Sequence, residues 1–328
     1  MRAAIIGVGS IAPTHINALK KAGHDIVALC DIKPEKCEAA KAKFGLDCPV
    51  YDDYKVMLTE LRPDTVHVCV PHYLHAPITC DVLALDINVL CEKPVAISRE
   101  QLAMLEVAVK KSRARLGVCH QNRYNSASVE VKEFLKGKTV SSATGNLCWC
   151  RDAAYYAAAS WRGFWATEGG GVMMNQALHT LDLLQWICGM PATVTATVEN
   201  HSLKGVIEEE DTAYGLFEVN DTTNFIINAT NCLHHSFAVN FAVSTTDSDE
   251  IYFLGNNLII NGEYKKTADK KPEHGKAVYG NSHQRLIADF YDCLESGREF
   301  PLGLSEARKV IELILAMYES KGERIDLK

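Results

Sequence analysis

Near its start the chain contains the segment AAIIGVGSIA, residues 3–12, in which a short apolar run is followed by a glycine-rich turn. Ala3–Ile6 is typical of a strand, and a helix is predicted after the turn, to about Ala22. The turn itself is Gly7-Val8-Gly9-Ser10-Ile11-Ala12. Its first glycine permits a tight turn, its second lets a pyrophosphate approach the backbone, and the small Ala12 lets helix and strand pack closely. Because the helix N-terminus favours anions, the segment predicts a dinucleotide site.

Asp31 supports the same prediction. It follows Ala12 by 19 residues, at the carboxyl end of a second predicted strand, Ile26–Cys30. An acidic residue at this position hydrogen-bonds a ribose 2′-hydroxyl, whereas a 2′-phosphate would meet like-charge repulsion. We therefore expect NAD as the cofactor and NADP as the less favoured one, although the nearby Lys33 softens the repulsion. The alternative is an ordinary loop aspartate or a cap of the helix that Pro34 opens.

The first 120 residues alternate short apolar runs with amphipathic stretches. Val66–Val70, Asn88–Cys91 and Arg115–Cys119 are typical of strands, the first suited to a sheet that is buried on both faces. The alternation predicts an α/β fold with a doubly wound, parallel Rossmann sheet. Ligands of such sheets lie at the carboxyl ends of the strands. The sequence places there Pro71, His72 and His75, then Glu92, Lys93 and Pro94, and finally His120, Gln121, Asn122, Arg123 and Tyr124.

After about residue 120 the pattern changes. Helices are predicted near 126–136 and 172–188, the second ending at Gly189, with an extended stretch over 140–152 between them. Four or five β-rich runs follow, with Asn220-Asp221 and Asn256-Asn257 as turns, and two helices end the chain. We therefore predict a dinucleotide-binding domain over residues 1–120 and a second, α+β domain over residues 121–328, with an open, mainly antiparallel sheet.

The composition excludes several classes of protein. The 328 residues include 34 Lys and Arg against 41 Asp and Glu, a formal charge of −7, with no basic stripe for nucleic acid. No apolar run reaches the ~18 residues of a membrane span. The 12 cysteines contain no CxxC pair, so we expect reduced thiols, a cytoplasmic protein and no disulfide framework. The histidine pairs lack partners at ligand spacing, so we expect no metal.

Several of these segments resemble the Gfo/Idh/MocA family of oxidoreductases. Glu92-Lys93-Pro94 is similar to its Glu-Lys-Pro signature, and Gly169-Gly170-Gly171 with Asn175-x-x-x-His179-x-x-Asp182 is similar to its second signature. The glycine turn, Pro71-x-x-x-His75 and Gln121-Asn122-Arg123 also fit, so the resemblance covers essentially the whole chain. It implies bound NAD or NADP, which Pro71, His75 and Glu92 would contact, and sugars, inositols or sugar nucleotides as substrates. It also implies homodimers or homotetramers, which we expect to form through the C-terminal sheet.

Oxidation of a secondary alcohol needs a hydride acceptor and a group that takes the hydroxyl proton. Lys93 lies at the predicted sheet edge, where a nearby nicotinamide would lower the pKa of the lysine toward a useful range. His179 is the second candidate base. It shares one helical face with Asn175 and Asp182, and Asp182 would bind the substrate or orient the imidazole. The alternatives are a surface lysine and a core histidine that Asp182 satisfies.

Asn175 departs from the commonest pattern of the family, which has an aspartate four residues before the histidine. An amide can hydrogen-bond a substrate hydroxyl but cannot take its proton, so the acid–base chemistry would fall to Lys93 and His179. We expect Asn175→Asp to be tolerated, because it restores the commoner residue. The Asn-x-x-x-His version resembles sugar-nucleotide and glycoside 3-dehydrogenases, which favours a pyranose ring over inositol.

Substrate specificity is predicted to come from Arg151–Arg162. Arg162 offers a fixed fork of donors for a carboxylate or phosphate, and Tyr155, Tyr156 and Trp161 offer stacking faces. Packing under a loop is the alternative for the two tyrosines. With the residues named above, the predicted substrate-binding set is Asn122, Arg123, Arg162 and Asp182.

Three functions stay open at this point. The first is an NAD(P)-dependent dehydrogenase acting on a CH–OH group of a sugar, sugar derivative or cyclic polyol. The second is a redox-neutral enzyme that keeps NAD bound and cleaves a glycosidic bond through transient oxidation, although such relatives tend to be longer. The third is a sugar-sensing regulator that kept the fold and lost catalysis, which the presence of Lys93 and His179 disfavours.

Overall fold

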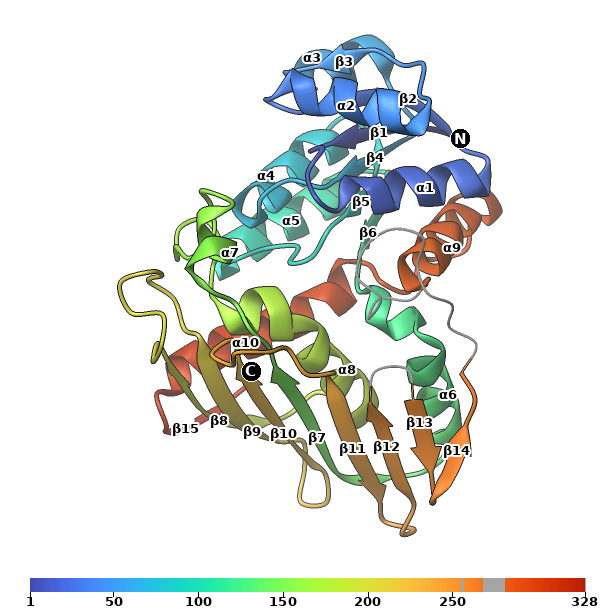
Figure 1. Ribbon diagram of the computed structural model, residues 1–328. Helices are drawn as coiled ribbons and strands as arrows, with labels where there is room; N and C mark the ends of the chain where they lie inside the picture. Colours follow the sequence, from blue (N-terminus) through green and yellow to red (C-terminus); the bar gives the residue numbers. More distant parts are fainter. Residues whose placement is uncertain (255–256, 268–280, 328) are drawn as a thin grey trace. The chain divides into compact units, whose positions relative to one another are not determined.

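A computed structural model describes residues 1–254, 257–267 and 281–327 (Figure 1). The chain folds into two compact units, Met1–Gln121 with Lys270–Arg308 and Asn122–Asp269 with Lys309–Lys328. Neither unit is a continuous segment. Residues 281–308, which the predicted division placed in the second domain, group with the first unit.

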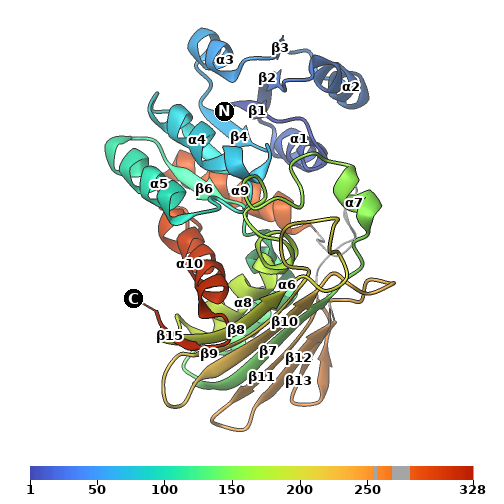
Figure 2. The ribbon, with the colours of Figure 1, turned by 90° about the vertical axis from the view of Figure 1, so that its left-hand side faces the viewer.

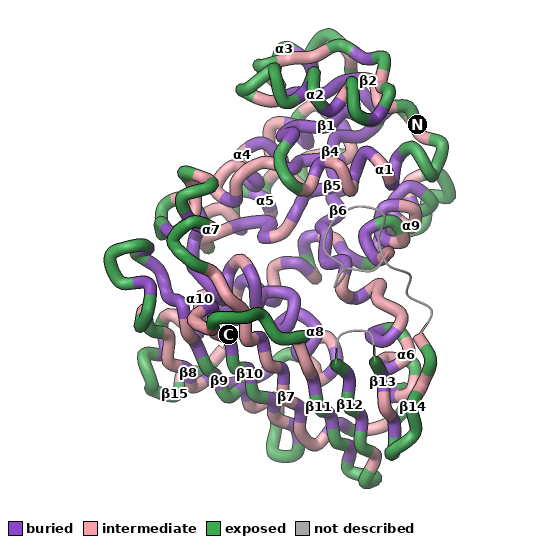
Figure 3. The backbone as a smooth tube through the Cα atoms, viewed as in Figure 1, coloured by how far each residue is buried: buried purple, intermediate pink, exposed green. Residues whose placement is uncertain are grey.

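The first unit is built on a six-stranded parallel sheet ordered β3-β2-β1-β4-β5-β6, which confirms the predicted Rossmann topology. The strands are β1 (Arg2–Ile6), β2 (Asp25–Cys30), β3 (Val50–Tyr51), β4 (Thr65–Val68), β5 (Asn88–Cys91) and β6 (Leu116–Val118). The central ones are buried along nearly their whole length, as Figure 3 shows, because helices cover both faces.

Several helices accompany this sheet. They are α1 (Ala12–Ala22), α2 (Pro34–Phe44), α3 (Tyr54–Leu61), α4 (His72–Leu83), α5 (Arg99–Lys111) and α9 (Ser282–Ser296). α1 packs against α9 on one face and α4 against α5 on the other (Figures 1 and 2). The strand order reverses between β1 and β4, so a crevice for ligands is expected at the carboxyl ends of these two strands.

The second unit contains a nine-stranded sheet ordered β14-β13-β12-β11-β7-β10-β9-β8-β15. It is mainly antiparallel, as predicted, but β7 and β10 pair in parallel. The strands are β7 (Val140–Cys148), β8 (Thr193–Glu199), β9 (Thr212–Glu218), β10 (Asn224–Thr230), β11 (Asn240–Thr245), β12 (Glu250–Leu254), β13 (Asn257–Ile260), β14 (Glu263–Lys265) and β15 (Arg324–Asp326). Asn256, one half of a predicted turn, lies outside the described residues.

The helices of this unit lie on one side of the sheet. They are a 3₁₀ turn η1 (Gln121–Tyr124), α6 (Ser126–Phe134), α7 (Ala153–Ala157), a π-helical segment η2 (Val172–Ala177), α8 (Leu178–Cys188) and α10 (Leu304–Ser320), which begins in the first unit. α8 packs against β7 and β10 (Figure 2). It comes so close that a Cβ on Gly145 of β7 would stand 2.7 Å from the Thr180 side chain.

The other face of this sheet carries exposed apolar side chains. Along β9 and β10 buried and exposed residues alternate, and the exposed ones include Tyr214, Leu216 and Ile226; β12 adds Tyr252 and Leu254. The described helices include none that is both long and apolar enough to cross a membrane.

Candidate active site

The glycine turn after β1 has the geometry that a pyrophosphate needs. Gly7 adopts a φ of +91°, and a Cβ there would lie 2.4 Å from the carbonyl oxygen of Cys69, so only glycine fits. Gly9 is exposed, and a Cβ on it would meet nothing within 4 Å. The turn leads through Ser10 and Ile11 into α1, which no side chain caps. Its first N–H groups are therefore available to an anion, and the residues fit a bound dinucleotide.

Asp31 lies directly after β2 and holds the same turn. Its Oδ2 accepts a hydrogen bond of 2.8 Å from the Val8 N–H, and its Oδ1 accepts one of 3.0 Å from the Lys33 N–H. Lys36, which the sequence reasoning did not consider, places its Nζ 3.9 Å from Oδ1. Each carboxylate oxygen has two lone pairs, so capacity remains for a ribose hydroxyl.

The loops after β4 and β5 are braced against each other by His75. Its Nδ1 lies 2.6 Å from the carbonyl oxygen of Pro94 and its Nε2 lies 2.8 Å from that of Val70. The imidazole is 1% exposed, and burial lowers its pKa. Since both ring nitrogens contact backbone carbonyls, the structure gives His75 a bracing role, and its contact with the cofactor stays a prediction. Pro71, also predicted to contact the cofactor, precedes the first residue of α4.

Glu92, directly after β5, is surrounded by histidines. His15 on α1 places its Nε2 2.9 Å from Glu92 Oε1, and His283 on α9 places its Nε2 3.6 Å from the same oxygen. The other oxygen accepts from the Lys93 backbone N–H at 3.2 Å. Burial alone would raise the pKa of this carboxyl, but the two imidazoles hold it well below its usual range. A carboxylate anion is therefore fixed beside the half-buried Lys93.

The histidine network extends deeper into the first unit. His15 Nδ1 lies 2.7 Å from His67 Nδ1, and His67 Nε2 lies 2.9 Å from the Tyr291 hydroxyl. Burial lowers the pKa of His67 well below its ordinary value, so this ring is neutral and accepts at one nitrogen while it donates at the other. Sequence reasoning missed His15, His67 and His283. Of the three, only His15 has a sequence signal, because its position along the predicted helix places it on the face toward the sheet.

Cys119 adds a third metal-ligating group to this corner. His15, Glu92 and Cys119 each offer one ligand atom, and these atoms lie within 4.8 Å of one another. Both ring nitrogens of His15 already have hydrogen-bonding partners, however, and burial raises the pKa of the Cys119 thiol well above its usual value. We therefore interpret the cluster as a hydrogen-bond network.

In the second unit, two predicted substrate-binding residues bind each other. Arg123 Nε donates to Asp182 Oδ2 at 2.9 Å and Arg123 Nη2 to Oδ1 at 2.6 Å, which is a bidentate ion pair. The two side chains are 5% and 0% exposed. The pair ties η1 to α8, and contact of either residue with a substrate stays a prediction.

Asn175 and His179 lie on successive turns, where the π-helical segment passes into α8. The structure thus divides the single helix predicted over Val172–Cys188. The Asn175 Nδ2 donates to Glu168 Oε1 in a short hydrogen bond, and Asn175 is half-buried. His179 is 6% exposed. That the two residues share one helical face stays a prediction, as do their roles, because Asn175 lies in the π-helical segment and His179 in α8.

Behind Asn175 lies a cluster of buried carboxyl groups that the sequence reasoning did not single out. Glu168, Glu209 and Glu210 are at most 2% exposed. Glu209 accepts from the Gly170 N–H at 2.8 Å, and Glu210 from the Gly171 N–H at 2.9 Å and the Tyr318 hydroxyl at 3.0 Å. Burial, together with the charges of Glu168 and Glu210, raises the pKa of Glu209 to about 9. Burial also raises the pKa of Glu210 to about 7 and that of Glu168.

Arg162 is held between aromatic faces. Its guanidinium carbon lies 4.2 Å from the centre of the Tyr155 ring and 5.4 Å from that of Trp161, and its Nη1 donates to the Tyr155 carbonyl at 3.1 Å. Tyr156, by contrast, is 4% exposed and packs with Leu203 and Ile207. The packing alternative therefore holds for Tyr156. Asn122, the remaining predicted substrate-binding residue, is half-buried in η1.

Two family models match the chain. The model described as "Oxidoreductase family, NAD-binding Rossmann fold" matches residues 1–120, and the "GFO/IDH/MocA C-terminal domain" model matches residues 138–259. The chain belongs to the Gfo/Idh/MocA family. It is an NAD-binding oxidoreductase, and the predicted cofactor, NAD, is confirmed.

Several known proteins are similar to this chain, over different shares of its length. D-glucoside 3-dehydrogenase of Escherichia coli (strain K12) is 24% identical over 100% of this chain and 97% of its own. The WlbA dehydrogenase from Bordetella pertussis, solved in complex with NADH and UDP-GlcNAcA, is 27% identical, covers 100% of this chain and 98% of its own, and has a TM-score of 0.86. Glycosyl hydrolase family 109 protein 1 of Akkermansia muciniphila is 31% identical over 31% of this chain and 23% of its own.

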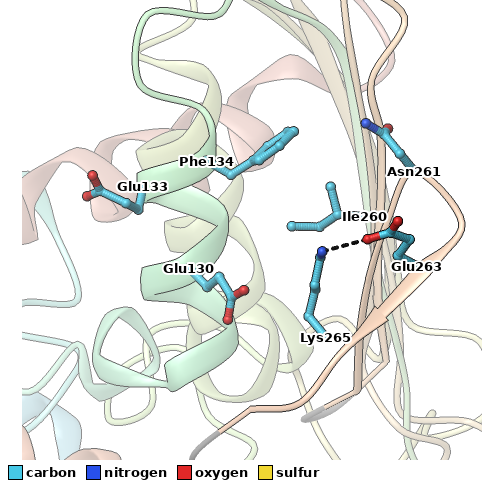
Figure 4. Close-up of a pocket in the computed structure, with 7 residues that line it drawn as sticks. All are labelled: Glu130, Glu133, Phe134, Ile260, Asn261, Glu263 and Lys265. Atoms are coloured by element: carbon cyan, nitrogen blue, oxygen red, sulfur yellow. Dashed lines mark hydrogen bonds and ion pairs between the residues drawn. The ribbon is translucent and has the colours of Figure 1, made fainter.

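One cavity lies apart from all the candidate residues. It has a volume of about 450 Å³ and opens between α6 and the β13–β14 hairpin (Figure 4). Phe134 and Ile260 supply apolar surface, and Lys265 Nζ binds Glu263 Oε2 at 2.9 Å across its rim. None of the predicted site residues lines it, so we assign it no part in the oxidoreductase chemistry.

Proposed function

We propose that this Gfo/Idh/MocA oxidoreductase transfers a hydride between NAD and a secondary hydroxyl carbon of a sugar or sugar derivative. The observation that carries the proposal is the similarity, over the whole chain, to a dehydrogenase solved with NADH and a nucleotide sugar. The similarity to a D-glucoside 3-dehydrogenase over the whole chain points to the same substrate class. Both favour a pyranose ring over an inositol.

The candidate residues have separate roles in binding the cofactor, moving the proton and binding the substrate. Gly7, Gly9 and the N-terminus of α1 bind the pyrophosphate, and Asp31 binds the adenosine ribose. NAD, when bound, accepts the hydride. Lys93 and His179 move the hydroxyl proton, and the carboxylate of Glu92 stabilises the charged form of its neighbour Lys93. Asn175 hydrogen-bonds a substrate hydroxyl.

Arg162 is the candidate for an anionic group on the substrate. Its guanidinium keeps donors to spare beyond the bond to Tyr155, and the two aromatic faces restrict its orientation. A carboxylate or a phosphate matches this fork of donors. Asn122 would complete the substrate contacts, whereas Arg123 and Asp182 would act by bracing α8.

We also infer that the enzyme assembles through the open face of the nine-stranded sheet. Tyr214, Leu216, Ile226, Tyr252 and Leu254 would be covered in a dimer or tetramer, and large exposed apolar faces mark protein interfaces. Light scattering with Tyr214→Lys tests the assembly, since a charge buried in the interface should dissociate it.

The twelve cysteines are all free thiols, which suits the reducing cytoplasm.

The test of the proposed reaction is a panel of sugars, polyols and sugar nucleotides, assayed for reduction of NAD by the absorbance of NADH. We expect turnover with pyranosides or sugar nucleotides. A panel on which no compound reduces NAD, with NAD binding intact, would contradict the proposal.

A redox-neutral glycosidase is the second candidate, since one similar protein is named a glycosyl hydrolase. That similarity covers less than a third of this chain, which leaves it the weaker candidate. Product analysis separates the two, because the glycosidase breaks a glycosidic bond without accumulating NADH.

A further inference from the structure

The amide of Asn175 has its orientation set by a buried glutamate. Its Nδ2 donates to Glu168 Oε1, and Glu168 is 0% exposed. The second oxygen of Glu168 accepts from the Gly163 N–H at 2.6 Å. If the amide turned over, its carbonyl oxygen would face the carboxylate, and two acceptors would meet without a proton between them. The amide nitrogen therefore stays on Glu168.

Glu168 is itself paired with a second buried carboxyl group. The charge of Glu168 contributes to the raised pKa of Glu209, so one proton is expected on this pair of neighbouring carboxyl groups. Glu209 Oε2 is buried, and no donor among the described residues faces it, whereas its Oε1 accepts from the Gly170 N–H. A proton on Oε2 satisfies that atom, which otherwise has no hydrogen-bonding partner among the described residues. The arrangement leaves Glu168 as the anion and Glu209 as the acid.

We propose that Glu168 is a positioning residue for Asn175: it holds the amide N–H so that the amide oxygen accepts the hydrogen of a sugar hydroxyl, while Glu209 carries the proton that allows the pair to be buried. The inference rests on the proposed function and extends it to the substrate contact. The ligand group it selects is a hydroxyl, which has a hydrogen to donate, in preference to a carbonyl or ether oxygen.

The same geometry reverses one expectation drawn from the sequence. The family pattern predicts that Asn175→Asp is tolerated, because it restores the commoner residue. In this chain an aspartate there would face the carboxylate of Glu168 and would lose the donor that Glu168 requires. We now expect it to lower kcat/KM roughly tenfold or more, because two neighbouring like charges disfavour each other.

An exchange of the two side-chain types tests the proposal. The variants are Asn175→Asp, Glu168→Gln and the double variant E168Q/N175D, in which the glutamine amide can donate to the new aspartate. Glu210→Gln is the matched control, because Glu210 is equally buried but bonds Gly171, Met173 and Tyr318 instead of Asn175. The readouts are kcat and KM for the sugar identified with the substrate panel, the dissociation constant of NAD and the melting temperature.

We expect Asn175→Asp to lose activity and the double variant to recover to within about threefold of the wild type, with NAD affinity unchanged throughout and KM for the sugar little changed in the control. Wild-type kcat/KM in Asn175→Asp, or a double variant no better than Asn175→Asp, would overturn the proposal. The melting temperature reports the same recovery without substrate, so a failure of the proposed sugar chemistry stays distinguishable from a failure of the positioning role.

Discussion

Glu92 in the first unit and Glu209 in the second are both buried carboxyl groups beside a candidate catalytic segment, but their surroundings differ. Glu92 receives two imidazoles and a backbone N–H. Glu209 receives one backbone N–H and lies next to two further glutamates. The pKa of Glu92 is accordingly lowered and that of Glu209 raised to about 9. Burial acts to raise the pKa of both carboxyl groups, so the neighbouring side chains account for the opposite directions of the two shifts.

The difference corresponds to two tasks. Next to Lys93, the fixed anion of Glu92 would favour the charged form of the lysine that we propose to exchange protons. Next to Asn175, the proposed anion of Glu168 orients a neutral amide, and a protonated Glu209 avoids the cost of burying a second anion.

The largest expected effect is a loss of turnover when either candidate proton-transfer residue, Lys93 or His179, is removed. Lys93→Ala and His179→Ala should each lower turnover ~10²–10⁴-fold, the usual contribution of a general acid or base. NAD affinity should stay nearly unchanged, because it rests on the glycine turn and Asp31. Steady-state kinetics and a separate NAD titration measure both quantities. Near-wild-type turnover in the histidine variant would refute its assignment.

The second largest effect should be a difference in stability between variants of Glu92 and Glu209, because only the first of these carboxyl groups is charged at neutral pH. At neutral pH Glu92→Gln should destabilise the first unit by about 1.5–3 kcal/mol, because it removes charged hydrogen bonds. Glu209→Gln should be close to neutral, since glutamine reproduces the protonated acid. Hydrogen exchange resolves the two units separately, which a single unfolding midpoint does not. Equal losses of protection in both variants would contradict the assignment of a charge to Glu92 and a proton to Glu209.

The pH dependence of stability should have opposite signs in the two regions. The depressed pKa of Glu92 contributes stability that is present above about pH 4.5 and is lost as the pH falls through the folded-state pKa. The raised pKa of Glu209 does the reverse: stability is lost progressively from about pH 4.5 up to about pH 9. Hydrogen exchange between pH 5 and 8 should therefore show the region around Gly170 weakening in the wild type but not in Glu209→Gln. A wild-type region that keeps constant protection would show that Glu209 is already ionised.

A smaller effect is expected at Asp31. The wild type should bind NAD more tightly than NADP, because a 2′-phosphate would face this carboxylate, although Lys36 softens the repulsion. Asp31→Asn should shrink the preference about tenfold, equivalent to one charged hydrogen bond. Fluorescence titration with both cofactors measures it, and equal affinities in the wild type would contradict the assignment.

Much of the fold could be predicted because its elements are local patterns. The run Ala3–Ile6, the glycines at 7 and 9, and the strands at 88–91 and 193–199 were all located correctly. The two-residue β3, the three-residue β14 and β15, and the short α7 were missed, because so few residues show no periodicity. That α9 packs with the first unit could not be predicted, since sequence order carries no information about such a return.

The candidate site was predictable only where a motif exists. Glu92, Lys93, Asn175 and His179 stand in signatures, whereas the histidines around Glu92 and the glutamates around Asn175 do not. Glu208-Glu209-Glu210-Asp211 has the composition of a solvated acidic loop, yet its last three residues are buried. Glu209 and Glu210 accept hydrogen bonds from the N–H groups of Gly170 and Gly171, which are distant in the sequence and meet them only in the folded chain. His15 and His67 are likewise ordinary helix and strand residues until they meet Glu92.

The most direct test of the central claim is the stoichiometry of NADH formed per molecule of sugar consumed, measured on the substrate that the panel identifies. Net transfer of one hydride to NAD predicts one NADH for each hydroxyl oxidised, with the glycosidic bond intact. Consumption of the sugar without accumulation of NADH, accompanied by a broken glycosidic bond, would contradict the account.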